Sequence, residues 1–193
     1  MIQKILINDL IKKIFNFYCI GDSITNGARN EFYRDIVLEL NYLYKDEKII
    51  FFKDSVNGET TSEILQRVLK IISANSVNGI LFLGGTNDTR ISIPNKIFEK
   101  NILTLIKICE KKNIKLYLAT IPKIYSGLPS YPKKIGNEII NGYNKIILRL
   151  SKKYNLSYID FSNLKEKFFI DGVHLNDLGT EFSAKLIKNK IKL

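Results

Sequence analysis

Short apolar segments alternate with longer amphipathic segments along most of this chain, and this alternation restricts the fold more than any other feature. The apolar segments carry few polar residues, which is typical of strands in a parallel sheet covered on both faces. The longer segments have apolar residues at helical spacing. We therefore predict strands over residues 16–20, 48–52, 79–83, 115–121 and 158–161 and helices over residues 29–44, 60–73, 96–112, 137–153 and 176–191.

Strands that alternate with helices form βαβ units, so the pattern predicts a three-layer α/β/α domain around a five-stranded parallel sheet. The chain has 193 residues, a length that suits one domain, and we assign residues 16–193 to it. Residues 1–15 alternate polar pairs with apolar residues, which predicts a short amphipathic helix appended to this domain. This segment lacks the features of a signal peptide, and no apolar run is long enough to cross a bilayer. We therefore expect a cytoplasmic protein without a transmembrane segment.

The net charge of +11 requires anionic partners to be considered, including nucleic acid, acidic lipid and acidic glycan. The lysines are scattered along the whole chain, and no basic run interleaved with aromatic residues occurs. We therefore expect no nucleic-acid partner, and the oligomeric state stays open.

Cys19 and Cys109 lie far apart, without a Cys-x-x-Cys motif or a Cys/His cluster. This pattern predicts two buried thiols and neither a zinc site nor a disulfide.

Four unusual segments directly follow predicted strands, where ligands bind in a parallel α/β sheet. Each segment alone has a structural explanation, because Gly-Asp-Ser caps helices and Asn-Gly forms turns. Their joint occurrence at one end of the sheet favours a shared site. The segments are Gly-Asp-Ser-Ile-Thr at 21–25, Ser-Val-Asn-Gly-Glu-Thr at 55–60, Gly-Gly-Thr-Asn-Asp at 84–88 and Asp-Gly-Val-His-Leu-Asn at 171–176.

The chemistry of these segments suits acyl transfer through a serine. His174 is the only histidine of the chain, and histidine is the residue type best suited to acid–base catalysis near neutral pH. Asp171 lies three positions upstream and can orient the imidazole, and Ser23 at a strand-to-helix turn can act as the nucleophile. The backbone N–H groups of Ser23 and Gly58 and the side-chain amide of Asn87 are suitable donors to an oxyanion.

These segments resemble the SGNH hydrolases, also called the GDSL esterase/lipase family. The resemblance implies a flavodoxin-like fold and hydrolysis of esters or thioesters through an acyl-enzyme, without a metal or another cofactor. It implies that Ser23 is the nucleophile, His174 the base and Asp171 its partner, with Ser23, Gly58 and Asn87 as oxyanion donors. The chain departs from the usual pattern through the extra residues 1–14 and through Ile24 in place of leucine. The Gly-x-Ser-x-Gly turn of ordinary α/β-hydrolases is absent.

The substrate is less constrained by the sequence. Residues 121–132 are rich in proline, glycine and tyrosine and are expected to form one wall of the site. Their Tyr125 and Tyr131 either contact a sugar or an acyl group or only pack this loop, and together with Asp22 they are our candidate substrate-binding residues.

The absence of a lid-sized domain favours a small acyl group such as acetyl, for example an O-acetyl group on a carbohydrate, with a lysophospholipid or a thioester as further options. Lys123, Lys133 and Lys134 favour an acidic alcohol portion. Two alternatives stay open. One is an acyltransferase that uses the same site, and the other is a non-catalytic basic module that binds an anionic partner.

Overall fold

The computed structural model of the chain describes residues 14–30, 34–126, 129 and 131–191. The helix predicted over residues 1–15 therefore falls almost entirely outside the described residues. Phe15 already belongs to the first strand, one residue earlier than expected.

A sheet of five parallel strands forms the centre of the molecule. The strands are β1 (Phe15–Gly21), β2 (Ile49–Ser55), β3 (Gly79–Leu83), β4 (Lys115–Ala119) and β5 (Ser157–Ile159). They lie in the order β2-β1-β3-β4-β5, so that Phe17 of β1 pairs with Phe51 on one side and Gly79 on the other. This order is the flavodoxin-like one. The predicted fold class is confirmed.

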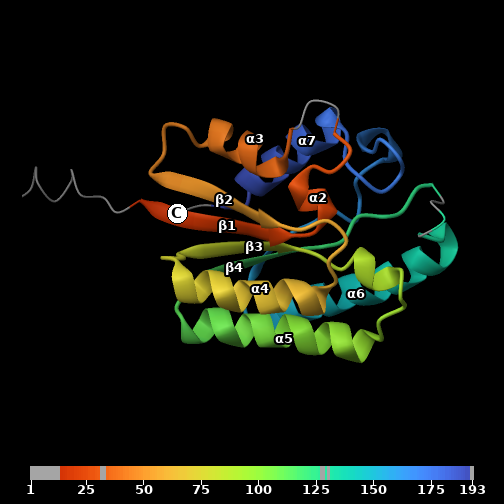
Figure 1. Cartoon of the computed structure of the whole chain (residues 1–193), viewed down its shortest axis with the longest axis horizontal. Helices are drawn as coiled ribbons and strands as arrows, with labels where there is room; N and C mark the ends of the chain where they lie inside the picture. Colours follow the sequence, from red (N-terminus) through yellow and green to blue (C-terminus); the bar gives the residue numbers. More distant parts are fainter. Residues whose placement is uncertain (1–13, 31–33, 127–128, 130, 192–193) are drawn as a thin grey trace, which may run out of the picture.

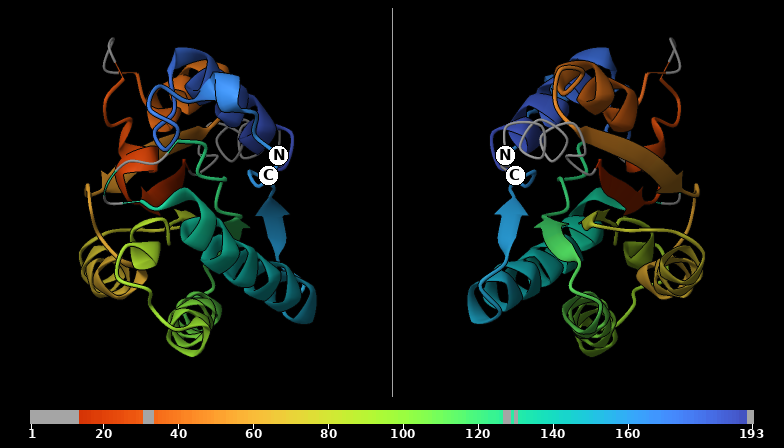
Figure 2. Two further views of the ribbon diagram at one scale, coloured as in Figure 1. Left: turned by 90° about the vertical axis from the view of Figure 1, so that its right-hand side faces the viewer. Right: turned by 90° about the vertical axis from the view of Figure 1, so that its left-hand side faces the viewer.

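Helices cover both faces of the sheet (Figure 1). One layer contains α4 (Thr61–Ala74), α5 (Asn95–Lys111) and α6 (Lys133–Lys153), and the other contains α3 (Ile36–Leu43), α7 (Asp177–Lys188) and the one-turn α2 (Ser23–Asn26). Views along the sheet separate the two layers clearly (Figure 2). Two short 3-10 turns complete the described elements, η1 (Asn87–Thr89) and η2 (Glu166–Phe168).

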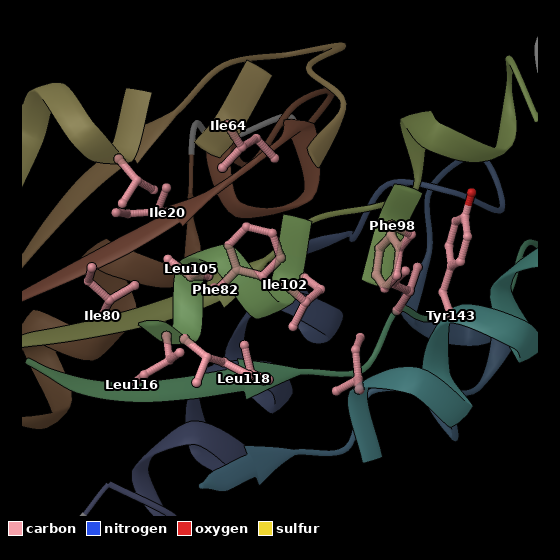
Figure 3. Packing of buried hydrophobic residues seen from close by; sticks show 14 of the residues in the cluster. Ile20, Ile64, Ile80, Phe82, Phe98, Ile102, Leu105, Leu116, Leu118 and Tyr143 are labelled. Carbon is pink, nitrogen blue, oxygen red and sulfur yellow. The ribbon is translucent and has the colours of Figure 1, made fainter. Parts of the chain in front are cut away.

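Alternation along the buried strands supplies one core to each helical layer. In β1, Tyr18 and Ile20 pack toward α4 and α5, whereas Phe17 and Cys19 pack toward α3 and α7. Because successive strand residues point to opposite faces, a continuously apolar strand fills both cores. Figure 3 shows the first core, in which the rings of Phe98 and Tyr143 stack with centroids 4.0 Å apart.

The element boundaries differ from the predictions where local capping outweighs apolar periodicity. The helix predicted from residue 29 begins only at Ile36, because the carboxylate of Asp35 accepts the N–H of Leu38 at 2.8 Å and caps the helix there. Conversely, α6 begins at Lys133 directly after Pro132, four residues before the predicted start. The first turn of α6 carries exposed lysines, so the spacing of apolar residues does not predict this turn as helical.

Cys19 and Cys109 are free and buried, as expected, and they lie in different cores on the two faces of the sheet. Burial raises the pKa of both thiols. Within the described residues, no helix combines the length and the apolar character needed to cross a bilayer.

Candidate active site

The four segments that follow strands meet at the carboxyl edge of the sheet. Ser23 opens α2 directly after β1, Gly58 lies between β2 and α4, Asn87 opens η1 after β3, and Asp171 and His174 lie between β5 and α7. Ser23, Gly58 and His174 line a pocket of about 480 Å³. Asn87 and Asp171 are not part of this lining but contact two of its residues, Tyr131 and His174. The described residues that line the pocket are Ser23, Ala28, Arg29, Asn57, Gly58, Arg90, Pro129, Tyr131 and His174.

The side chains of Ser23, His174 and Asp171 form one chain of hydrogen bonds. The Nε2 atom of His174 lies 3.0 Å from the Oγ atom of Ser23, and its Nδ1 atom lies 2.7 Å from Oδ2 of Asp171. An ionised carboxylate can only accept, so the tautomer that fits has its proton on Nδ1. In that tautomer Nε2 accepts the hydroxyl proton of Ser23. The imidazole is thus arranged to remove this proton.

Asp171 is held in place through both of its carboxylate oxygens. Its Oδ1 atom accepts the backbone N–H groups of Val173 at 3.0 Å and of His174 at 2.8 Å, which leaves Oδ2 for the imidazole. Burial alone would raise the pKa of Asp171, but these hydrogen bonds outweigh it and hold the pKa below its usual value. The carboxylate is therefore ionised near neutral pH. The Nε atom of Arg29 lies 3.4 Å from Oδ2 as a further cationic neighbour.

The turn that carries Asp171 and His174 depends on Gly172, whose φ of +82° is costly for other residues. A Cβ atom at this position would collide with Ser126. The contact is close because the backbone N–H of Tyr125 donates to the carbonyl of Gly172 at 2.9 Å and the hydroxyl of Ser126 donates to the carbonyl of Asp171. The segment after β4 thus supports the turn after β5.

Asp22 fixes the start of α2 and hence the backbone of Ser23. Its Oδ1 atom accepts the N–H of Ile24 at 3.0 Å, and the side chain is completely buried. Burial raises the pKa of Asp22 to about 7, since it outweighs the hydrogen bond from Ile24, and the nearby carboxylate of Asp88 adds to the rise. Asp22 was a candidate for substrate binding, but the structure places it beneath Ser23 and outside the pocket lining.

The side-chain amide of Asn87 has a fixed orientation. Its Oδ1 atom accepts the hydroxyl of Tyr131 at 2.5 Å, and its Nδ2 atom donates to the carbonyl of Glu59 at 2.9 Å. An amide nitrogen has two N–H groups, so one remains for a further acceptor. Gly58, next to Glu59, has a φ of +86° and lines the pocket without a Cβ atom.

Residues 19–182 match the model of the GDSL-like Lipase/Acylhydrolase family. The chain belongs to this family. It is a hydrolase that acts on ester bonds, and a serine–histidine–aspartate triad with an oxyanion hole is typical of this family. No curated protein matches the acylhydrolase at a significant level.

Solved structures share the fold of this acylhydrolase at low sequence identity. The acetyl xylan esterase AlAXEase is 23% identical, with a TM-score of 0.76 over 91% of this chain and 98% of that one. A lipase/acylhydrolase from Enterococcus faecalis is 23% identical, with a TM-score of 0.74 over 91% and 94% of the two chains. A putative G-D-S-L family lipolytic protein from Desulfitobacterium hafniense is 17% identical, with a TM-score of 0.76 over 90% and 98%.

The two candidate tyrosines of the acylhydrolase have different surroundings. Tyr131 lines the pocket and contacts Asn87. Tyr125 is not part of the pocket lining, because its hydroxyl donates to the carbonyl of Leu164 and its ring packs 5.4 Å from that of Phe169. The sequence could not separate these two residues, since both lie in the same irregular segment.

The cations at the pocket of the acylhydrolase are also different from those expected. Lys123, Lys133 and Lys134 are exposed outside the lining, which instead contains Arg29 and Arg90. Sequence reasoning missed both arginines. Arg90 follows Asn87 by three residues, so its place in the motif loop was the available signal. For Arg29, the only available signal was its proximity to Ser23 in the sequence.

One further residue missed in the sequence connects the ends of β1 and β2 in the acylhydrolase. Arg67 of α4 donates to the carbonyl of Gly21 at 3.0 Å and to the carboxylate of Glu59 at 2.5 Å, and it also pairs with Asp54. It therefore connects the end of β1 to the end of β2 and to the loop that follows β2. No cluster of histidine, cysteine and acidic side chains suited to a metal ion occurs among the residues that the structure describes.

Proposed function

We propose that this acylhydrolase cleaves carboxylic esters through an acyl-enzyme on Ser23, with His174 as the base and Asp171 as the residue that orients it. The observation that carries this proposal is the continuous chain of contacts at 3.0 Å and 2.7 Å from the Ser23 hydroxyl through the imidazole to the carboxylate. Serine is a weak nucleophile until an adjacent base removes its proton. The contact of 3.0 Å between the imidazole and the hydroxyl supports this role for His174.

In the first step, the Oγ atom of Ser23 attacks the ester carbonyl carbon while its proton moves to Nε2 of His174. The carbonyl oxygen becomes an oxyanion, and we assign its donors as the backbone N–H groups of Ser23 and Gly58 and the free N–H of the Asn87 amide. The intermediate collapses when the ester C–O bond breaks and the proton on Nε2 passes to the leaving alcohol. The acyl group then remains on Ser23.

In the second step, water takes the place of the alcohol. His174 removes a proton from the water, the resulting hydroxide attacks the acyl carbon, and the same three donors stabilise the new oxyanion. Breakage of the bond to Oγ returns the proton from Nε2 to Ser23 and releases the carboxylic acid. The ionised Asp171 stabilises the imidazolium that forms in both steps.

We further propose a short acyl group, with an O-acetyl group on a carbohydrate as the preferred form. The open pocket of about 480 Å³ supports this assignment, because the described residues that line it form no deep apolar channel for a long chain. The structural likeness to an acetyl xylan esterase is consistent with it. Tyr131 at the pocket wall offers an aromatic face of the kind that sugars contact.

The test compares para-nitrophenyl esters from acetyl to palmitoyl with the wild type and with Ser23→Ala. We expect the highest kcat/KM for the acetyl ester and a loss of roughly four or more decades in kcat for the variant. A kcat/KM that rises steadily with chain length would contradict the short acyl group. Undiminished turnover by Ser23→Ala would contradict the mechanism itself.

A further inference from the structure

A second hollow adjoins the pocket at Ser23. It has a volume of about 560 Å³ and shares Ala28, Arg29 and Asn57 with the first, so the two hollows are adjacent, and we call them together the groove. The described residues that line the second hollow are Asn26, Gly27, Ala28, Arg29, Asn30, Lys53 and Asn57. Asparagine and basic side chains dominate this described part of the lining, which has no large apolar side chain. Such a surface suits a polar group of the substrate rather than a hydrocarbon chain.

The described charged side chains that line this groove all have one sign. Among the described residues that line the two hollows, Arg29, Lys53 and Arg90 are basic, and none is acidic. The chain as a whole carries 19 acidic residues beside its 30 lysines and arginines, so an all-cationic lining is not a simple consequence of composition. A groove with walls of one charge sign attracts ligands of the opposite sign.

Arg29 has the most capacity left for a ligand. Lys53 forms an ion pair with Asp35 at 2.8 Å, and Arg90 lies over the ring of Tyr131. The side chain of Arg29 is 61% exposed, and within the described part of the chain it pairs only with Asp171, through Nε at 3.4 Å. A guanidinium has five N–H groups, so its terminal nitrogens can still donate to an anion.

The position of Arg29 also indicates which part of the ester it faces. His174 gives its proton to the leaving alcohol, so the alcohol portion lies on the side of the imidazole and its partner Asp171. Arg29 contacts Asp171 on that side and stands where the two hollows join. Arg90 lies near Gly58 and the proposed oxyanion donors instead. An alcohol that leaves past Arg29 enters the second hollow.

We propose that the natural ester has an anionic alcohol portion, recognised by Arg29 in the hollow between α2 and β2. This inference rests on the proposed function and names its substrate class, an acylated alcohol that bears a carboxylate, sulfate or phosphate group. Arg29 determines specificity through a charge-assisted hydrogen bond to that group. The asparagines around it, including Asn57 with its hydrogen bond from Asn26 at 2.8 Å, present polar groups to further hydroxyls of the alcohol.

The backbone at Arg29 allows a variant that removes the guanidinium without straining the main chain. Its φ of +65° lies in the left-handed region, which glycine adopts without strain. Arg29→Gly therefore suits the local backbone, and Arg29→Lys restores a positive charge at the same position. Lys107→Gln, at an exposed position in the C-terminal half of α5, is the matched control for the loss of one positive charge.

The experiment measures kcat/KM for two acetyl esters whose phenols have similar acidity, those of para-hydroxyphenylacetate and of its uncharged amide. We expect the wild type to prefer the anionic ester by roughly fivefold to thirtyfold, as one charge-assisted hydrogen bond supplies. Arg29→Gly is expected to reduce this ratio to about onefold to twofold, Arg29→Lys to restore part of it, and Lys107→Gln to leave it in place. A parallel pair with the charge on the acyl group, the para-nitrophenyl half-ester of adipic acid and its amide, is expected to show a smaller preference.

A ratio near one in the wild type would overturn the inference. So would a ratio that Arg29→Gly leaves unchanged, or a stronger preference for charge on the acyl group. Labelling of Ser23 by a fluorophosphonate separates this failure from failure of the proposed function. A labelled, active enzyme without the preference refutes the substrate class alone, whereas an unlabelled enzyme that cleaves neither ester refutes the proposed function and this inference together.

Discussion

Each polar side-chain atom of His174 and Asp171 has a hydrogen-bond partner of its own. Each imidazole nitrogen has one partner, and each carboxylate oxygen of Asp171 has its own donors. This arrangement fixes the ring orientation as well as its tautomer. The two backbone N–H groups on Oδ1 prevent the carboxylate from turning, so Oδ2 stays directed at the imidazole.

Asp171→Asn should therefore reverse the tautomer of His174 rather than merely weaken a contact. The amide oxygen would keep the two backbone N–H groups and turn the amide nitrogen toward Nδ1, which would move the ring proton to Nε2. The base would then present a proton to the hydroxyl of Ser23. We expect kcat to fall by roughly three to four decades with little change in KM. Steady-state kinetics on an acetyl ester checks this, and a loss below tenfold would contradict the role of Asp171.

Asn87 offers a second test at the residue scale. Asn87→Ala removes one proposed oxyanion donor, and we expect kcat to fall by roughly two to three decades. Tyr131→Phe leaves the donor in place but removes the hydroxyl that holds its Oδ1 atom, so a smaller loss of about tenfold is expected.

The matched control for Tyr131→Phe is Tyr125→Phe, which also removes one tyrosine hydroxyl in the same segment but lies outside the pocket lining. We expect its kcat to stay close to that of the wild type. If Asn87→Ala kept full activity, the oxyanion assignment would be wrong.

At the scale of the elements, the sequence predicts the strands and their order of appearance well, because buried parallel strands are continuously apolar. It also predicts the loops that carry Ser23, Gly58, Asn87 and the His174 turn, since residues after parallel strands meet at one edge. Helix ends were less predictable. Asp35 and Pro132 set two of them through capping and backbone restriction, which apolar periodicity does not register.

The side chains between the motifs were the least predictable part of the site. Arg29 lies after a one-turn helix and has a positive φ, and it lines the pocket because of this local backbone. No pattern of residue types predicts such a backbone. Tyr131 and Tyr125 diverge because of contacts with Asn87 and Leu164, which are 44 and 39 residues distant in the sequence. Such long-range contacts determine which loop residues face a ligand.

The turn between β5 and α7 gives a prediction at this scale. Gly172→Ala places a Cβ atom against Ser126 and strains a backbone with a φ of +82°. We expect the free energy of unfolding to fall by about 1–3 kcal/mol. We also expect kcat to fall even in the fraction of the variant that is folded, because the turn sets the position of His174. Denaturant unfolding and kinetics on the same sample check both. A stable variant with unchanged kcat would show that the turn does not control the imidazole.

At the scale of the whole molecule, the position of β1 between β2 and β3 brings together residues that lie far apart in the sequence. Ser23 and His174 are separated by 151 positions, yet their side chains are in hydrogen-bond contact across the edge of the sheet. Such a site cannot form in any partial fold that lacks either the first strand or the last helix. Activity and global stability should therefore be lost together on unfolding.

Burial of Asp22 in this fold makes global stability depend on pH. Its folded-state pKa of about 7 lies above the value of an unfolded aspartate, so its contribution to stability is complete below about pH 4 and is lost as the pH rises to 7. Asp22→Asn cannot ionise. We therefore expect the Tm of this variant to rise relative to the wild type between pH 4 and pH 7, by several degrees in total.

Asp160→Asn is the control for this pH dependence. Burial raises the pKa of Asp160, but hydrogen bonds from Ser162, Thr120 and Asn163 outweigh it and leave the pKa below its usual value. Above about pH 5 that carboxylate is ionised in both the folded and the unfolded state, so the Tm difference from the wild type should stay constant between pH 5 and pH 7. A constant difference for Asp22→Asn as well would contradict the raised pKa.

The most direct test of the account is covalent labelling by a fluorophosphonate followed by peptide mapping, with the wild type beside His174→Ala. We expect one modified residue, Ser23, in the wild type and labelling slower by several orders of magnitude in the variant, because the imidazole removes the hydroxyl proton. Modification of a different residue, or equally fast labelling without His174, would contradict it.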